Sequence, residues 1–338
     1  MTTAARVDAR RLLTYLWIIF LVRGLFYISF VPLWEGFDEW SHYAAIQNLA
    51  NGNHLLASRS DPVSKEVQAS LQLIGWVPGS ADPGGQHRLY WQSSEAERSS
   101  RERQLRSIPA QWAREPASGG AGAYEAQQGP LYYWILAPFY KLSANLSFLT
   151  RVWLLRLLSV LLASAVIPLG FLVARKVQGE DFYALGVVAL IAAMPQVAIT
   201  ASHIANDSLA IALGSLFLIV LFLWKEEPHS MPRSVALGVT LGLALLTKAS
   251  LLAFIPPVAV FVSIWAKRKN VYRQVLVVAA CAMVVSIWWY VRNWILTGTL
   301  AGEQIGMGAS GSELSLFPAI FKVNWLTAVA LLLATVTW

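Results

Sequence analysis

The sequence contains few charged residues and a single cysteine. Asp, Glu, Lys and Arg make up 13% of its 338 residues, whereas an average soluble domain contains about 25%. This scarcity of charge, with 56% hydrophobic residues, excludes an ordinary cytosolic globular protein. It also excludes a disordered chain, which needs low hydrophobicity and a high net charge. The single cysteine, Cys281, lies in an apolar run, which excludes a disulfide framework and a cysteine-based metal site.

The net charge of +7 does not indicate a nucleic-acid partner. Many of the basic residues flank apolar segments, as the positive-inside rule for membrane proteins leads one to expect. We therefore expect an all-α polytopic membrane protein, with residues 1–338 forming a single transmembrane domain surrounded by membrane lipids. The sequence shows no internal repeat.

Eight apolar segments are candidates for membrane spans. A bilayer core about 30 Å thick requires roughly 20 mostly apolar helical residues. The predicted spans are 12–34, 151–174, 183–204, 207–224, 233–247, 250–266, 274–294 and 321–338. The polar residues 35–129 predict a large first extracytoplasmic loop that carries interfacial helices. Residues 130–142 are too few to span and rich in aromatics, which predicts a helix in the outer interface.

The positions of lysine and arginine predict the orientation. If the spans alternate, four basic segments fall on one side, which the positive-inside rule makes cytoplasmic. These residues are Arg6, Arg10 and Arg11, then Arg175 and Lys176, then Lys225 and Arg233, and finally Lys267, Arg268, Lys269 and Arg273. The N-terminus is then cytoplasmic and the long loop extracytoplasmic.

Polar residues that border the membrane gather on the opposite face. They are Asp38, Glu39 and His42 after the first span, Glu125 and Gln128 at the end of the long loop, Asn206 and Asp207 before the fourth span, Lys248 after the fifth, and Arg292 and Asn293 at the end of the seventh. Ionisable residues at a membrane are costly and usually face a cavity. Their shared side predicts one polar cavity that opens at the outer surface.

Several of these residues have simpler interpretations. Asp207 has the chemistry of a helix cap, and Lys248 and Arg292 have side chains long enough to reach lipid headgroups. Asp38 is expected to cap a helix that runs to about residue 50, which places His42 one turn further along the same face. That pair suits a divalent metal ion of unknown identity, with Asp207 as a third ligand, or an oriented base. The alternative is a capped interfacial helix.

Five short motifs resemble those of the GT-C glycosyltransferases, in particular bacterial family-39 membrane proteins related to protein O-mannosyltransferases and lipid A aminoarabinose transferases. The motifs are DEWSHY at 38–43, EAQQGPLYYW at 125–134, NDSLA at 206–210, LGLALLTK at 241–248 and RN at 292–293. Two features depart from the family. Gly129 stands where the family usually has the first of two prolines, and the sequence ends in an apolar stretch, which indicates a short homologue or a truncated chain.

The resemblance implies a GT-C-like helical bundle in a bacterial plasma membrane, and sugar transfer from a polyprenyl-phosphate donor to a protein, glycan or lipid acceptor. It implies catalytic roles for Asp38, Glu39 and Asp207, with Asp38 as general base and inversion at the anomeric carbon. Substrate-binding roles fall on His42, Glu125, Gln128, Asn206, Lys248, Arg292 and Asn293. A transporter or flippase of lipid-linked sugars and a non-catalytic envelope scaffold are the alternatives from other classes.

Overall fold

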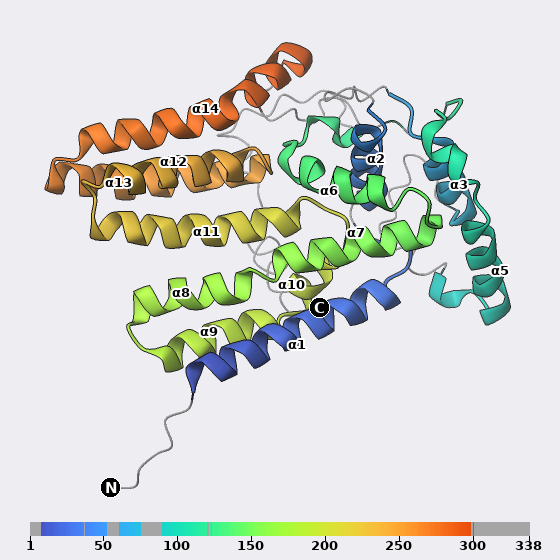
Figure 1. The fold of residues 1–338 in the computed structure, drawn as a ribbon, viewed down its shortest axis with the longest axis horizontal. Coiled ribbons are helices and arrows are strands. Elements are labelled where there is room, and N and C mark those ends of the chain that lie inside the picture. The colour runs from blue at the N-terminus through green and yellow to red at the C-terminus, as the bar shows by residue number, and fades with distance from the viewer. Residues whose placement is uncertain are drawn as a thin grey trace, which may run out of the picture.

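The computed structural model describes residues 8–36, 38–52, 61–75, 90–119, 122, 124–298 and 300. These residues form a bundle of long helices with a group of short helices at one end (Figure 1). The described part of the chain contains no β-strand, only isolated bridges between Pro62 and Gly122 and between Ser64 and Pro116. The expectation of an all-α polytopic membrane protein is confirmed.

Within the part of the chain that the structure describes, nine helices make up the bundle. They are α1 (Ala9–Phe30), α7 (Phe148–Ala163), α8 (Val166–Gln178), α9 (Asp181–Ala193), α10 (Pro195–Ala201), α11 (Asp207–Glu226), α12 (Met231–Leu245), α13 (Ile255–Lys269) and α14 (Tyr272–Thr297). Within the described residues, four stretches are long and apolar enough to cross a membrane: α1, α7 together with α8, α11 and α14. The helices α12 and α13 are apolar but shorter.

The segment expected to span at 183–204 is not one straight helix. It is divided into α9 and α10, which meet at an angle of 63°. Met194 is extended between them, with φ −65° and ψ 117°, and Pro195 begins α10. Proline disfavours a helical conformation of the preceding residue and has no backbone N–H to continue the helix. The expected span 321–338 lies outside the described residues.

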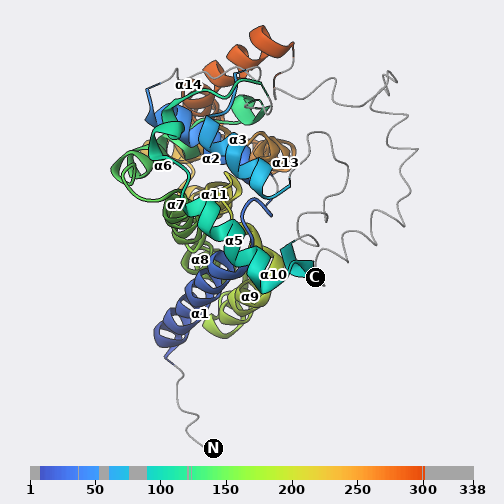
Figure 2. The same cartoon turned by 90° about the vertical axis from the view of Figure 1, so that its right-hand side faces the viewer.

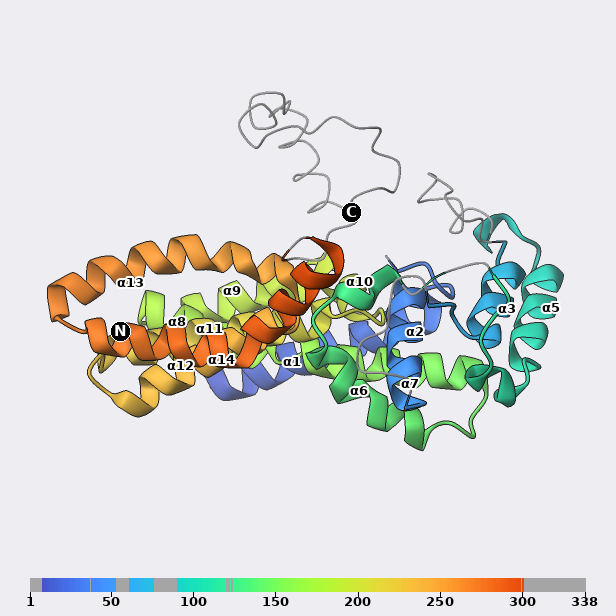
Figure 3. The same cartoon turned by 90° about the horizontal axis from the view of Figure 1, so that it is seen from above.

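The connections between the long helices place the basic segments together. The turns α8–α9, α11–α12 and α13–α14, and the start of α1, all lie at the end of the bundle away from α2 (Figures 1 and 3). Arg175 pairs there with Asp181 at 2.9 Å, and Arg233 pairs with Glu227 at 2.8 Å. The basic residues of these four segments that the structure describes therefore share one end of the bundle.

The other end carries the short helices, and we call it the loop-bearing end. They are α2 (Glu39–Ala50), α3 (Lys65–Leu73), α5 (Glu95–Arg106) and α6 (Leu131–Leu142), with the 3-10 turns η1 (Ala110–Arg114) and η2 (Tyr124–Gln127). Figure 2 shows α2, α3, α5 and α6 from this end. They pack around a core that is rich in aromatic rings and includes Trp34, Tyr43, Tyr132 and Phe148. Helix α6 coincides with the expected interfacial helix at 130–142.

Two glycines bring α12 close to α14. A Cβ atom at Gly238 would lie 2.4 Å from the carbonyl oxygen of Val278, and one at Gly242 would lie 2.9 Å from that of Ala282. Any larger residue would force the two backbones apart. This contact aligns the end of α12, which leads to Lys248 just before the 3-10 turn η3 (Ala249–Phe254), with the end of α14 that carries Arg292.

Candidate functional site

Asp38 occupies a constrained position before α2. Its φ of 57° and ψ of 14° put it in the left-handed region, which is uncommon for a residue other than glycine and costs about 1–3 kcal/mol. It occupies the N-cap position, but its side chain makes no capping hydrogen bond. The expected side-chain capping is therefore wrong: a capping residue typically has a β-region backbone, and Asp38 has a left-handed one. Asp38 is half-buried.

Glu39, the next residue, is fully buried and bound on both oxygens. Arg156 of α7 donates to Oε1 at 2.7 Å and to Oε2 at 2.6 Å, and the backbone N–H of Ile204 also donates to Oε1 at 3.1 Å. Burial opposes ionisation, but the Arg156 guanidinium outweighs it and holds the pKa of Glu39 below its ordinary value. Both oxygens of the Glu39 carboxylate are thus occupied by protein donors, which favours a positioning role over the expected catalytic one.

Arg156 also binds the chain that leads into α2. It donates to the carbonyl oxygens of Val31 at 2.8 Å and Pro32 at 2.9 Å. One buried guanidinium thus joins the end of α1, the start of α2 and α7. Because Asp38 lies between these contacts in the sequence, Arg156 determines where its backbone is held.

His42 is also buried, and it lies one turn after Asp38, as expected. Its Nδ1 is 2.8 Å from the hydroxyl of Tyr133, and the two rings stack with centroids 5.9 Å apart. Burial lowers the pKa of His42 to about 4, and the positive charge of Lys248 acts in the same direction. His42 is therefore neutral at physiological pH and serves as a hydrogen-bonding group.

Residues 125–131 connect the separate polar segments. The backbone N–H of Glu125 donates to Ser41 of α2 at 3.2 Å. The carbonyl oxygen of Gln127 accepts hydrogen bonds from Asn293 at 2.9 Å and Trp289 at 3.1 Å, both on α14. The amide of Asn206 donates to the side chain of Gln128 at 3.2 Å and to the carbonyl of Thr247 at 3.0 Å.

Gly129 allows this segment to lie against the end of α12. A Cβ atom there would be 2.1 Å from the carbonyl oxygen of Leu246, and the N–H of Leu131 donates to that same oxygen at 3.3 Å. Glycine provides the space for a backbone-to-backbone contact between residues 129–131 and 246–247.

We call the contacts of residues 125–131 with α2, Asn206, the end of α12 and α14 the junction. Asp207 and Lys248 form an ion pair beside it. The Lys248 ammonium lies 2.7 Å from each carboxylate oxygen, and both side chains remain partly exposed. Its charge reaches Asp38: burial raises the pKa of Asp38 above its ordinary value, and Lys248 opposes that rise. Asp38, His42, Asp207 and Lys248 therefore form one electrostatic group.

Arg292 lies on the α14 side of the junction. It donates to Asn293 at 3.0 Å, and its guanidinium carbon is 4.5 Å from the centre of the Trp289 ring. Trp289 and Asn293 both bind Gln127, so Arg292 is held beside residues 125–128. Stacking on an indole fixes the plane of the guanidinium group.

The residues expected to bind a metal ion do not form a suitable site. Among the described residues, no group of three or more His, Cys, Asp and Glu side chains is arranged to hold a metal ion. The expected ligands were Asp38, His42 and Asp207. Both carboxylate oxygens of Asp207 accept hydrogen bonds from Lys248, and Nδ1 of His42 is hydrogen-bonded to the hydroxyl of Tyr133. These contacts favour hydrogen bonding and charge pairing in place of metal coordination.

Sequence reasoning missed a second buried network. Glu66 of α3 forms an ion pair with Arg151 of α7 and accepts hydrogen bonds from Tyr43 at 2.9 Å and Gln47 at 3.0 Å. Gln47 also donates to Tyr140 at 2.8 Å. The available signal was the presence of an arginine within an apolar helix, which requires a buried partner.

No curated protein and no solved structure matches the chain. A match does exist with the family described as "Predicted membrane protein (DUF2142)", and it extends over residues 20–330. It includes every segment of the junction described above, from Asp38 to Asn293. The chain therefore belongs to the DUF2142 family of membrane proteins.

Proposed function

We propose that this protein is a glycosyltransferase of the GT-C type. It would transfer a sugar from a polyprenyl-phosphate donor to a hydroxyl-bearing acceptor at the extracytoplasmic face of the membrane. The observation that carries the proposal is the junction at the loop-bearing end, where residues 125–131 are hydrogen-bonded to α2, α12 and α14 and to Asn206. The basic segments lie at the opposite end, which supports an extracytoplasmic site.

Asp38 is the proposed general base. As the bond between the anomeric carbon and the donor phosphate oxygen breaks, the acceptor oxygen bonds to that carbon and its proton passes to the Asp38 carboxylate. Polyprenyl phosphate is the leaving group. A single displacement of this kind inverts the anomeric centre. The raised pKa of Asp38 suits this role, because a base becomes more effective as its pKa approaches the working pH.

Two cationic groups at the loop-bearing end, Lys248 and Arg292, would stabilise the leaving phosphate. Lys248 retains exposed surface although it pairs with Asp207, and Arg292 is oriented by Trp289 and Asn293. Negative charge develops on the phosphate as the sugar departs, so preorganised donors at this position lower the barrier. Asp207 would keep the Lys248 ammonium in place.

The remaining polar residues would hold and orient the substrates. The set comprises His42, Glu125, Gln128, Asn206 and Asn293. His42 is neutral and can exchange hydrogen bonds with sugar hydroxyls. Asn206 and Gln128 bind each other across the junction, so displacing either would disturb the reacting geometry.

The test separates the proposed base from the proposed phosphate-binding residue. Purified protein in nanodiscs is assayed for single-turnover transfer from undecaprenyl-phosphate-linked mannose, glucose, galactose and arabinose, and for binding of undecaprenyl phosphate. Asp38→Asn should abolish transfer and leave binding of undecaprenyl phosphate nearly unchanged, because the amide keeps the size of the side chain but cannot accept the proton. Arg292→Ala should weaken binding by about 1–3 kcal/mol.

Asp181→Asn and Arg175→Ala are the matched controls, because this exposed ion pair lies at the opposite end of the bundle. Both control variants should behave as the unmodified protein. If Asp38→Asn retains near-normal transfer, or if the unmodified protein transfers none of the four sugars but moves the lipid across a proteoliposome membrane, the enzyme proposal fails and the flippase alternative replaces it.

A further inference from the structure

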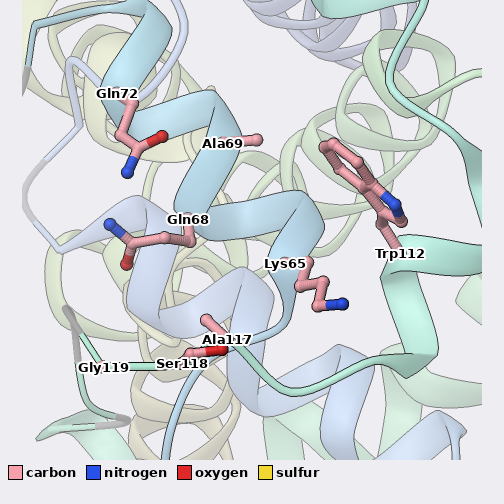
Figure 4. Close-up of a pocket in the computed structure, with 8 residues that line it drawn as sticks. All are labelled: Lys65, Gln68, Ala69, Gln72, Trp112, Ala117, Ser118 and Gly119. Carbon is pink, nitrogen blue, oxygen red and sulfur yellow. The ribbon is translucent and has the colours of Figure 1, made fainter.

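A hollow of about 430 Å³ lies beside α3, η1 and residues 117–119. Gln68 and Gln72 project to one side of α3, and the indole of Trp112 lies on the other side of the helix (Figure 4). Ser118 belongs to the extended segment that borders the hollow. Its volume falls within the range of about 300–1,000 Å³ that small-molecule sites occupy. None of the motifs that define the proposed active site contributes to it.

The side chains around the hollow suit a ligand with many hydroxyl groups. Gln68 and Gln72 are four residues apart, so their amides lie one turn apart on the same face of α3. Each amide can donate and accept hydrogen bonds, as the hydroxyl of Ser118 can. Trp112 is partly buried and offers a flat apolar ring. The C–H face of one sugar ring packs on such a surface, and the hydroxyls of a neighbouring ring of the same oligosaccharide reach the amides on the other side of α3.

The charge balance of the hollow favours a neutral ligand. Lys65 is the charged residue of the lining, and its ammonium lies 2.8 Å from the carboxylate of Glu115. This pairing leaves no net positive charge to attract a phosphate or a carboxylate. A site for an acidic ligand would need unpaired cations or a convergent set of guanidinium groups.

Helix α3 is firmly attached to the helix that begins beside Asp38. Its opposite face carries Glu66, which binds Tyr43 and Gln47 of α2 as well as Arg151 of α7. Val67 and Leu71 of the same face belong to the aromatic core. A ligand held on the open face of α3 is therefore held at a constant position relative to α2.

We propose that this hollow binds a neutral oligosaccharide by stacking on Trp112 and hydrogen bonding to Gln68 and Gln72. As an acceptor-binding subsite, this assignment rests on the proposed function, and it identifies the acceptor class as a glycan. As a carbohydrate-binding site, it stands on the geometry of the hollow alone. The experiment measures binding and transfer separately for this reason.

Binding is measured by saturation-transfer difference NMR on the full-length protein in nanodiscs. The probes are mannotetraose, cellotetraose, maltotetraose and galactotetraose, each up to 20 mM, with tetragalacturonate as the charged comparison. At least one neutral tetrasaccharide should bind, and tetragalacturonate should bind at least tenfold more weakly. Trp112→Ala and Gln72→Ala should each weaken binding at least tenfold, whereas Trp112→Phe, which retains a ring, should weaken it less than threefold.

Gln111→Ala is the matched control. Gln111 is exposed and lies next to Trp112 in η1, but it does not line the hollow. It should leave binding unchanged. The proposal is overturned if no neutral tetrasaccharide binds or if tetragalacturonate binds equally well. It is also overturned if the Gln72→Ala variant, which is altered at an exposed residue, binds the tetrasaccharide as well as the unmodified protein does. Asp38→Asn should retain tetrasaccharide binding. If it also retains transfer, the proposed function fails while the carbohydrate site remains supported.

Discussion

Replacing Gly129 with alanine tests the close backbone contact between residues 129 and 246 at the loop-bearing end. The added Cβ atom would lie 2.1 Å from the carbonyl oxygen of Leu246 and 2.5 Å from its carbonyl carbon. Ordinary contact begins at 3.4 Å, so the two backbones would have to separate by about 1.3 Å. Both sides of the contact are main chain, so no flexible side chain can relieve the clash.

The separation has two measurable consequences. Overpacking of this kind costs about 1–3 kcal/mol of stability, which should appear as a lower unfolding temperature. Because residues 125–131 also hold Asn206 and Asn293, the reacting groups should be displaced by a similar distance. A misplacement of about 1 Å can reduce a reaction rate about 100-fold, and we expect a loss of that order in single-turnover transfer.

Gly186→Ala provides the control for the same chemical change. Gly186 lies within α9, and no atom is within 4 Å of the position that its Cβ would take. Alanine is favoured over glycine in a helix by up to about 1 kcal/mol, so this variant should unfold at the same or a higher temperature. If Gly129→Ala is as stable and as active as Gly186→Ala, the close contact between residues 129 and 246 is refuted.

Three further predictions follow from the charges of the site. The rate of transfer should rise with pH along an acid limb set by Asp38, at a pKa above that of an ordinary aspartate. Lys248→Gln should move this limb to higher pH, because Lys248 lowers the pKa of Asp38. A rate–pH profile of both proteins checks the prediction, and an acid limb at the same pH in both contradicts it. His42 has a folded-state pKa of about 4 against an ordinary value of 6.5. Between these values the unfolded chain binds a proton that the folded protein does not, so the free energy of unfolding is unaffected above pH 6.5 and falls by on the order of 3 kcal/mol as the pH is lowered towards 4. His42→Gln should therefore flatten the decline of unfolding temperature over that interval, and an identical decline in both proteins would contradict the assignment. Arg156→Met leaves the buried Glu39 without its cationic partner and should cost about 3–5 kcal/mol of stability. Adding Glu39→Gln should restore part of that loss in thermal unfolding, and a double variant less stable than the single one would exclude this explanation.

The sequence predicted the helical class and the grouping of the polar motifs for clear physical reasons. Apolar runs of roughly 20 residues are characteristic of membrane spans, and basic residues mark one set of connections. If the spans alternate, residues as distant as Asp38 and Arg292 must lie at the same end of the bundle. The structure joins these segments through residues 125–131.

The contacts within the site were not predictable in the same way. A carboxylate that follows a span is equally suited to catalysis, helix capping and ion pairing, and the sequence contains no information on its partner. Asp38 and Glu39 illustrate this, because they are adjacent and chemically similar. Arg156 lies 117 positions from Glu39 and binds it, whereas Asp38 is half-buried and makes no capping bond. The partner's position decides the role, and only the packing of α7 against α2 supplies it.

Two arginines on α7 have the same relation to the loop-bearing end. Arg151 binds Glu66 of α3, and Arg156 binds Glu39 of α2. They are five residues apart, which is about 7.5 Å along the helix axis, so each meets a different short helix. A buried ion pair adds little net stability compared with apolar residues of the same volume, but it tolerates no change of partner or position.

It follows that these pairs act chiefly on geometry. If α2 shifted by one residue along α7, Glu39 would lose Arg156 and a charge would remain buried without compensation, at a cost of several kcal/mol. A purely apolar contact would tolerate such a shift more readily, because hydrophobic burial is not directional. Asp38 directly precedes Glu39 and is held in a strained backbone conformation. That strain costs about 1–3 kcal/mol, and separating Glu39 from Arg156 would cost about 3–5 kcal/mol, so the Arg156 pair is sufficient to hold the Asp38 backbone in this conformation.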